Sequence, residues 1–272
     1  MIVFVFLTMC IASALNYFKL PPKVRQRLLD LYFSPTGGIG YSLGRIHINS
    51  CDFSLGPYSF DEVPGDYDLQ YFDTQVTHDT VQIIPFIRAA LDTAKAPIRL
   101  LASPWSPPSW LKATDATHNA SMLSSVVPNG LIDTDEAKTT WAKYISKFIT
   151  AYDYLGIKIW AVTPQNEPEF PVCSTYYRRF ISFYKTNMLI LHTMYVYINI
   201  YTYVQAPWEA CAYTSTNEKD FVSGYLGPAL RQEHPEVLIL GFDHNKDHLN
   251  EWSEELLQGK GHHFVDGMAF HW

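Results

Sequence analysis

Along the chain, apolar runs of β type alternate with stretches of helical periodicity. The β-type runs cover residues 38–50, 97–103, 157–163, 237–242 and 265–272, and helical patterns cover 21–33, 79–94, 134–156 and 216–234. Such alternation is typical of βα units that build a parallel sheet.

The clearest helix is predicted over residues 134–156. Acidic residues at positions 135 and 136 belong to its first turn, and Gly156 follows its last turn, as helix ends favour. The apolar residues recur at the three- and four-residue spacing of one helix face: Trp141, Tyr144, Ile145, Phe148, Ile149 and Tyr152.

The fold predicted from this alternation is α/β. No glycine-rich phosphate loop follows any of the predicted strands, so a nucleotide-binding doubly wound sheet loses its main support. A (β/α)8 TIM barrel fits better, but the five predicted strands are fewer than eight and the sequence stops on a strand. We therefore expect an incomplete TIM barrel.

Composition narrows the function classes. With 272 residues, 47% of them hydrophobic and 17% charged, the chain can build a core, which excludes wholesale disorder. The net charge of −7 argues against a nucleic-acid partner. The aromatic content of 15% suits either a carbohydrate cleft or a well-packed interior, and composition alone favours the interior. The four cysteines fit no zinc spacing.

The first residues admit two interpretations. Residues 1–14 are apolar and end in small residues, like a secretory signal, but no Lys or Arg precedes Lys19. The alternative is a gene model whose start codon falls inside the domain.

Polar and aromatic residues follow each predicted strand. In an α/β barrel the active site lies at these carboxyl ends of the strands. Together they describe a polar cleft with stacking surfaces, which suits a sugar. The residues are Asn49, Cys51, Asp52 and Phe53; Ser103, Trp105 and Trp110; Gln165, Asn166 and Glu167; Asp243, His244 and Asn245; and His271 with Trp272.

The most specific feature is the sequence TPQNEP, in which Glu167 stands just beyond a buried strand. A glycosidase needs a carboxylic acid with a raised pKa to protonate the leaving oxygen, next to a donor for the sugar 2-hydroxyl. Asn166 and Glu167 supply this pair. The alternative is that Glu167 is a carboxylate in an ordinary surface turn. The strand context and the other strand-end residues favour the catalytic interpretation over this alternative.

Six ordered segments together resemble the glucosylceramidases of glycoside hydrolase family 30. They are GIGYSLGRIHINSCDFS, LLASPWSPPSWLK, WAVTPQNEPEF, PWEACAYT, YLGPAL and VDGMAFHW, and in order and spacing they cover roughly residues 12–272 apart from one segment. The resemblance implies a (β/α)8 barrel and retaining hydrolysis of a β-glucoside, typically glucosylceramide.

The resemblance also implies roles for single residues. Glu167 would be the acid/base and Asn166 the partner of the 2-hydroxyl. The residues implied to bind the sugar are Asp52, Phe53, Trp105, Asn166, Asn245 and His271, with Arg45 as an ion-pair partner behind them. Alternatives remain: Asp52 could cap its loop, Trp110 could be lid packing, and His271 could be a core histidine. No cofactor or metal is expected, and the pair His262–His263 is a poor metal site because adjacent histidines rarely ligate one ion.

The chain departs from the family pattern at both ends. The family's nucleophile is a Glu on the seventh strand, beyond the match to AFHW, and its first strand with a Gly-rich turn should precede residue 12. We therefore expect a barrel lacking its first strand and its last strands, with residues 1–11 signal-like or a gene-model artefact, residues 12–171 and 206–272 its two parts, and no activity in the isolated chain.

A third departure is an insertion at residues 172–205. Its 34 residues contain no Asp, Glu, Gly, Pro or Ala but 7 of the 18 tyrosines, so the usual turn residues are missing. Val172 can begin with GT and Gln205 can be CAG, the two ends of an intron, which suggests a translated intron. The alternative is a hairpin that touches a membrane surface.

The expected function is therefore that of a glycosidase acting on glucosylceramide, a glycolipid partner, in sphingolipid catabolism. The alternatives are a β-xylosidase or another β-glycosidase of the same clan, and an inactive carbohydrate-binding barrel. Family resemblance suggests a lysosomal or secreted protein, and the sequon Asn119-Ala-Ser121 is consistent with a secretory route.

Overall fold

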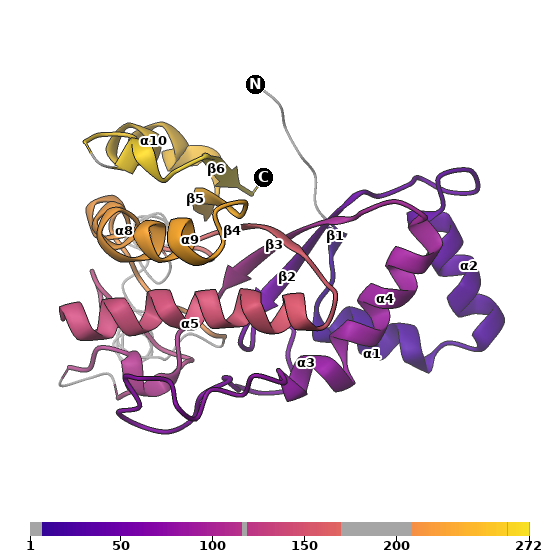
Figure 1. Cartoon of the computed structure of the whole chain (residues 1–272), viewed down its shortest axis with the longest axis horizontal. Coiled ribbons are helices and arrows are strands. Elements are labelled where there is room, and N and C mark those ends of the chain that lie inside the picture. Colours follow the sequence, from indigo (N-terminus) through magenta and orange to yellow (C-terminus); the bar gives the residue numbers. More distant parts are fainter. Residues whose placement is uncertain (1–6, 116–118, 170–207, 260, 272) are drawn as a thin grey trace, which may run out of the picture.

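The computed structural model describes residues 7–115, 119–169, 208–259 and 261–271, and these form one parallel sheet with helices around it (Figure 1). Six strands lie side by side in the order of the chain. They are β1 (Leu7–Thr8), β2 (Leu43–Ile48), β3 (Arg99–Pro104), β4 (Ile159–Val162), β5 (Leu238–His244) and β6 (Gly267–Phe270).

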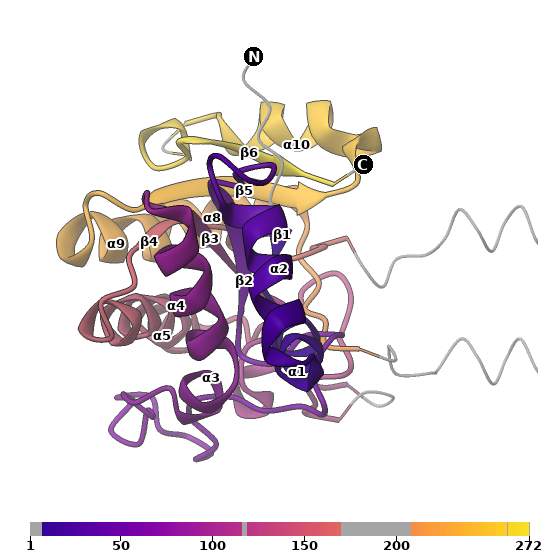
Figure 2. The ribbon, with the colours of Figure 1, turned by 90° about the vertical axis from the view of Figure 1, so that its right-hand side faces the viewer.

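The helices lie between successive strands and cover the outside of the sheet (Figures 1 and 2). They are α1 (Ile11–Lys19), α2 (Pro22–Phe33), α3 (Thr77–Val81), α4 (Ile83–Ala94), α5 (Asp135–Tyr154), α8 (Ser215–Phe221), α9 (Gly227–Glu233) and α10 (Leu249–Leu256). A π-helical turn, η2 (Val222–Leu226), joins α8 to α9, and short 3-10 turns lie at η1 (Ser109–Leu111), η3 (Lys246–His248) and η4 (Gly261–His263).

This arrangement confirms the predicted incomplete TIM barrel. Every neighbouring pair of strands is parallel, and sequential neighbours joined through helices are the connectivity of a (β/α)8 barrel. In such a sheet all carboxyl ends of the strands meet at one rim. The polar residues predicted to follow the strands belong to this rim.

The structure corrects one detail, the missing first strand. Leu7 and Thr8 pair in parallel with Gly44 and Arg45 of β2, and Met9 is fully buried. A short apolar run has the same pattern whether it is a signal segment or a buried strand, so periodicity alone could not distinguish the two.

Helix α5, the longest predicted element, has the capping and the buried face that the sequence indicated. Its N-cap, Thr134, accepts a hydrogen bond from the Ala137 amide at 3.2 Å, and the left-handed Gly156 (φ 74°) follows its end. The apolar face that the spacing predicted is buried against the sheet, with Trp141 and Tyr144 fully covered. Local capping and tertiary burial thus favour the same boundaries.

The suspected insertion at 172–205 falls wholly within the stretch from 170 to 207, outside the described residues, so the intron and the membrane-hairpin hypotheses both stay predictions. Among the helices of the described residues, none has the length and apolar character needed to cross a bilayer.

We expect Trp141→Ala to lower the free energy of unfolding by about 3–5 kcal/mol, because it empties a fully buried aromatic site in the middle of α5. Tyr154→Ala, at the 86% exposed end of the same helix, is the matched control and should change it by less than about 0.5 kcal/mol. Urea denaturation measures both values, and similar losses in the two variants would contradict the assigned core face.

Candidate active site

The carboxyl ends of three strands carry residues in the left-handed backbone region. These are Asn49 after β2 (φ 64°), Glu167 after β4 (φ 49°), and Phe242 and Asp243 in β5 (φ 76° and 60°). Side chains other than glycine rarely adopt this region, and such strain collects at functional sites, where the surrounding structure holds it in place. The backbone therefore points to the same rim as the sequence pattern.

A bulge at the end of β5 aims two successive polar side chains at this rim. The register with β6 shifts between Phe242 and His244, so Asp243 and His244 are not held to the strict alternation of a regular strand. Buried Glu218 of α8 supports the bulge, because its Oε1 accepts the Phe242 amide at 2.8 Å. Burial raises the pKa of Glu218 to about 8.

Asp243 is the centre of a buried network. Its Oδ2 accepts hydrogen bonds from Arg45 Nη2 at 2.6 Å, from Ser103 Oγ at 2.9 Å and from Thr163 Oγ1 at 2.7 Å. Its Oδ1 lies 3.2 Å from His271 Nε2. Burial alone would raise the pKa of Asp243, but the Arg45 guanidinium and His271 hold it well below its usual range.

The same arginine positions the Asn-Glu pair. Arg45 Nη2 donates to Asn166 Oδ1 at 2.7 Å while it also pairs with Asp243 at 2.6 Å. The backbone N–H of Asn166 donates to Pro104 O at 2.8 Å, and the backbone N–H of Glu167 donates to Asp243 O at 3.0 Å. The turn after β4 is thereby fixed to β3 and β5, so Glu167 starts from a rigid backbone.

The carboxylate of Glu167 is partly exposed, with 26% of its side chain accessible, and faces a histidine. Its Oε1 lies 3.3 Å from His271 Nδ1, so His271 bridges Glu167 and Asp243. Although burial opposes it, contact with the two carboxylates raises the pKa of His271 to about 9. The hydrogen bond from His271 in turn lowers the pKa of Glu167. The raised pKa expected for a glycosidase acid is therefore not found with the described residues alone.

Asp52 and Phe53 are exposed on the loop that follows β2. Burial and the neighbouring charges of Glu167 and Glu209 raise the pKa of Asp52, which places these three carboxylates in one electrostatic environment. Phe53 is 53% exposed. Glu209, for which no role was predicted, is almost fully buried.

The remaining predicted residues differ in how much surface they offer. Trp105 is only 5% exposed, with the Arg45 guanidinium 4.7 Å from its ring centre, so little of the ring can stack on a sugar. Trp110 donates to Asp61 O at 2.9 Å and packs on Tyr67, as a lid residue would. Asn245 Oδ1 is buried with no hydrogen-bond partner among the described residues.

Three donor atoms at the rim are close enough to share a cation. Glu167, His244 and His271 each offer one, all within 4.8 Å of one another, among the residues that the structure describes. Sequence reasoning did not single out this group, because its members follow three different strands.

Sequence reasoning also gave no role to Asp243, Thr163 and Glu218, although it placed Asp243 among the strand-end residues. A usable signal existed for Asp243: where a carboxylate directly after an apolar run such as VLILGF is buried with that run, it requires a cation such as Arg45. Glu218 carries no such signal, because nothing in a helical pattern shows which polar residue turns inward.

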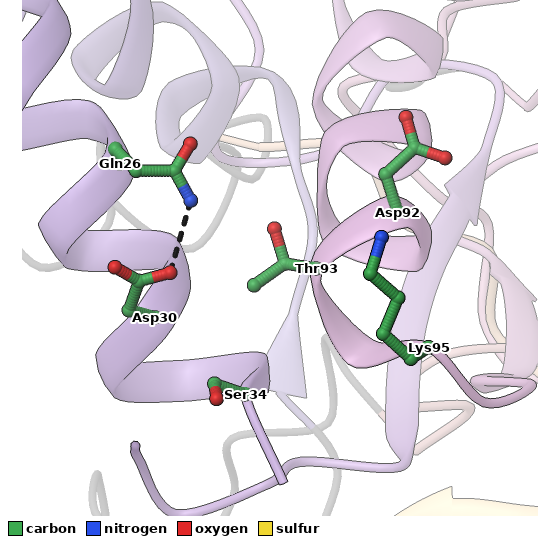
Figure 3. Close-up of a pocket in the computed structure, with 6 residues that line it drawn as sticks. All are labelled: Gln26, Asp30, Ser34, Asp92, Thr93 and Lys95. Atoms are coloured by element: carbon green, nitrogen blue, oxygen red, sulfur yellow. Dashed lines mark hydrogen bonds between the residues drawn. The ribbon is translucent and has the colours of Figure 1, made fainter. Parts of the chain in front are cut away.

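A separate pocket lies away from the strand ends, between α2 and α4 (Figure 3). Its lining is polar and includes Asp30, whose carboxylate accepts from Gln26, and Lys95. It contains no aromatic side chain that could stack on a sugar ring, so the strand-end rim remains the candidate site.

Comparison with known proteins agrees with this geometry. The TIM-barrel domain of glycosyl hydrolase family 30 matches residues 5–186. The chain is 32% identical to the lysosomal acid glucosylceramidase of Mus musculus over 262 residues, 96% of this chain and 44% of the relative. It is 26% identical to an endo-1,6-beta-D-glucanase of Neurospora crassa over 261 residues, 95% of this chain and 45% of the relative.

Among solved structures, SrfJ from Salmonella typhimurium superposes with a TM-score of 0.75 at 28% identity, over 98% of this chain and 49% of that one. The chain thus spans about half the length of the relatives it matches.

The His271 bridge gives a pH-dependent prediction for stability. Because the pKa of His271 is higher in the folded chain (about 9) than its ordinary 6.5, the charged ring stabilises the fold fully below about pH 6.5. This stabilisation, at most about 3 kcal/mol, is lost as the pH rises through 9. His271→Asn should therefore cost stability at pH 6 and much less at pH 9.5, as measured by urea denaturation.

The exposed Asn250 on α10 supplies the control for this measurement, because its side chain carries no ionisable group. Asn250→Gln should give the same small change at both pH values. An equal loss at pH 6 and pH 9.5 in His271→Asn would contradict the charged bridge.

Proposed function

Because this chain belongs to glycosyl hydrolase family 30, we propose that it carries the acid/base half of a retaining β-glycosidase, with Glu167 as the catalytic acid and base. The observation that carries the proposal is that the Glu167 carboxylate is partly exposed at the rim on a backbone held in place by hydrogen bonds. The Glu167 backbone is fixed by hydrogen bonding to Asp243, while its side chain remains partly exposed at the rim. A rigidly held carboxylate that a ligand can reach is what general acid catalysis requires.

In this proposal Glu167 acts twice. It first protonates the leaving oxygen as the glycosidic bond breaks, and it then removes a proton from the water that releases the sugar. Asn166, held by Arg45, turns its amide group toward the 2-hydroxyl. Asp52 and Asn245 offer acceptors for further hydroxyls, and Phe53 and Trp105 border the ring.

A second carboxylate is needed for double displacement, about 5–5.5 Å from the first. Among the described carboxylates near Glu167, Asp243 is buried and committed to Arg45, Asp52 lies on an exposed loop after β2, and Glu209 is almost fully buried in a loop. We therefore assign the nucleophile to a Glu outside the described residues. Its negative charge would also raise the pKa of Glu167, opposing the effect of His271.

The proposed substrate is a β-glucoside with a lipid aglycone, glucosylceramide. This rests on the mouse relative, which is named as an acid glucosylceramidase, and a glycolipid substrate would bring the strand-end rim to a membrane surface. The Neurospora relative, which is named as an endo-1,6-beta-D-glucanase, favours the second candidate, another β-glycosidase of the same clan. A β-xylosidase and an inactive carbohydrate-binding barrel remain further alternatives. A panel of glucosylceramide, aryl β-xyloside and β-1,6-glucan distinguishes the three catalytic options.

The acid role is tested with Glu167→Gln in the full-length product of the gene. We expect hydrolysis of aryl β-glucosides with poor leaving groups to fall by about 10²–10⁴, because those oxygens need a proton as they leave. Dinitrophenyl β-glucoside should still form the glycosyl-enzyme, because its dinitrophenolate leaves without a proton. A burst of released dinitrophenolate would show this step. Residues 1–272 alone should bind a β-glucoside in calorimetry without turning it over.

Glu169→Gln is the matched control, since Glu169 lies two positions away and contacts His248 instead of His271. It should keep the activity of the wild type within a few-fold. An equal loss on every leaving group in Glu167→Gln would argue against the acid role. Binding without turnover in the full-length protein would favour the inactive barrel.

The proposed location is the lysosome, reached through the secretory route, and it rests on the name of the mouse relative. The sequon residue Asn119 lies on an exposed loop, where a glycan can be attached. In protein from a eukaryotic secretory host, we expect a glycosidase-sensitive mass that Asn119→Gln removes. Asn250→Gln, an exposed Asn outside any sequon, is the control and should leave the mass of the glycan in place. A wild type without any glycan would contradict this route.

A further inference from the structure

We propose that Glu167, His244 and His271 bind one divalent transition-metal cation such as Zn²⁺, and that this cation competes with the acid/base role of Glu167. A carboxylate and two imidazoles are a donor set that zinc prefers, with a fourth position left for water. The three donor atoms lie within 4.8 Å of one another at the strand-end rim.

One edge of this site already has the spacing of a metal centre. Zn–N and Zn–O bonds of about 2.0–2.2 Å with tetrahedral angles place neighbouring donor atoms roughly 3.3 Å apart. His271 Nδ1 and Glu167 Oε1 are separated by 3.3 Å. The donor of His244 must approach by about 1.5 Å at most, which rotation of the ring can supply.

His271 also has the support that metal-binding histidines require. Its second nitrogen, Nε2, lies 3.2 Å from the buried Asp243 carboxylate. A carboxylate at this position fixes the orientation of the ring and directs Nδ1 toward the ion. Arg45 keeps Asp243 ionised, so the support persists when the proton between His271 Nδ1 and Glu167 is replaced by a cation and released to solvent.

His244 supplies the third donor because of the bulge in β5. Its Nδ1 is buried and has no hydrogen-bond partner among the described residues, and its Nε2 lies 4.0 Å from Glu169 Oε2. The rings of His244 and His271 meet edge to face, with centroids 6.3 Å apart. Because Nδ1 makes no hydrogen bond among the described residues, the ring gives up none there when it turns toward a cation.

Cation binding and catalysis would exclude each other. A Glu167 oxygen that coordinates zinc cannot carry the proton that the leaving group needs. This consequence rests on the proposed function, whereas binding of the cation does not. The binding experiment therefore uses no substrate, so failure of the glycosidase assignment and failure of the metal site can be told apart.

Calorimetric titration of the full chain with ZnCl2 tests the site. We expect one Zn²⁺ per chain in the wild type, with affinity at least tenfold weaker in His244→Asn and in Glu167→Gln. Co²⁺ titration should give the absorption of a tetrahedral ion in the wild type and lose it in both variants. His248→Asn is the control, because this half-exposed ring contacts Glu169 and lies outside the group. It should bind as the wild type does.

Thermal melting separates loss of the site from loss of the fold. Zinc should raise the melting temperature of the wild type and of His248→Asn, and leave that of His244→Asn unchanged. If the wild type binds no stoichiometric zinc, if His244→Asn binds it equally well, or if His248→Asn loses it, the proposed site is wrong.

Discussion

The ion pair of Arg45 and Asp243 is the interaction on which the rim depends. A buried carboxylate is costly unless its charge is paired and its lone pairs are filled, and removal of one partner of such a pair typically costs about 3–5 kcal/mol. Asp243 meets these conditions through Arg45 of β2, Ser103 of β3 and Thr163 at the end of β4, together with His271 after β6. Five strands are therefore tied together at the end where the reactive carboxylate stands.

The same network determines the electrostatics of that carboxylate. Arg45 keeps Asp243 charged, Asp243 keeps His271 charged, and His271 stabilises the anion of Glu167. A glycosidase acid must instead be protonated, so this half of the site needs a further negative charge opposite Glu167 before it can serve as an acid. Without that charge, the arrangement favours a bound proton or cation between His271 and Glu167. Catalytic acid and metal ligand are thus two uses of one electrostatic arrangement.

Sequence patterns predicted the elements that are determined by capping residues or by the regular spacing of apolar residues. Helix α5 has a cap, an acidic first turn and a buried face, and its predicted span differs from the observed one by at most two residues. The rim followed from the rule that parallel strands end together, which is why Asn166 and Glu167 could be named in advance, whereas Arg45 was named only from the family resemblance. The two-residue β1 could not, because its pairing with β2 depends on residues more than thirty positions away. The spacing of apolar residues along the chain gives no information about such long-range contacts.

The left-handed pair at Phe242 and Asp243 shows most clearly what a sequence hides. Phe does not signal positive φ, Asp is enriched there but adopts it in few of its positions, and an apolar run such as VLILGF predicts a regular strand. The conformation is stable because buried Glu218, from a preceding helix, accepts the Phe242 amide. A regular strand would turn Asp243 and His244 to opposite faces, and one of them would leave the rim. The ion pair, the histidine bridge and the third metal donor therefore all depend on a bulge that only the folded chain reveals.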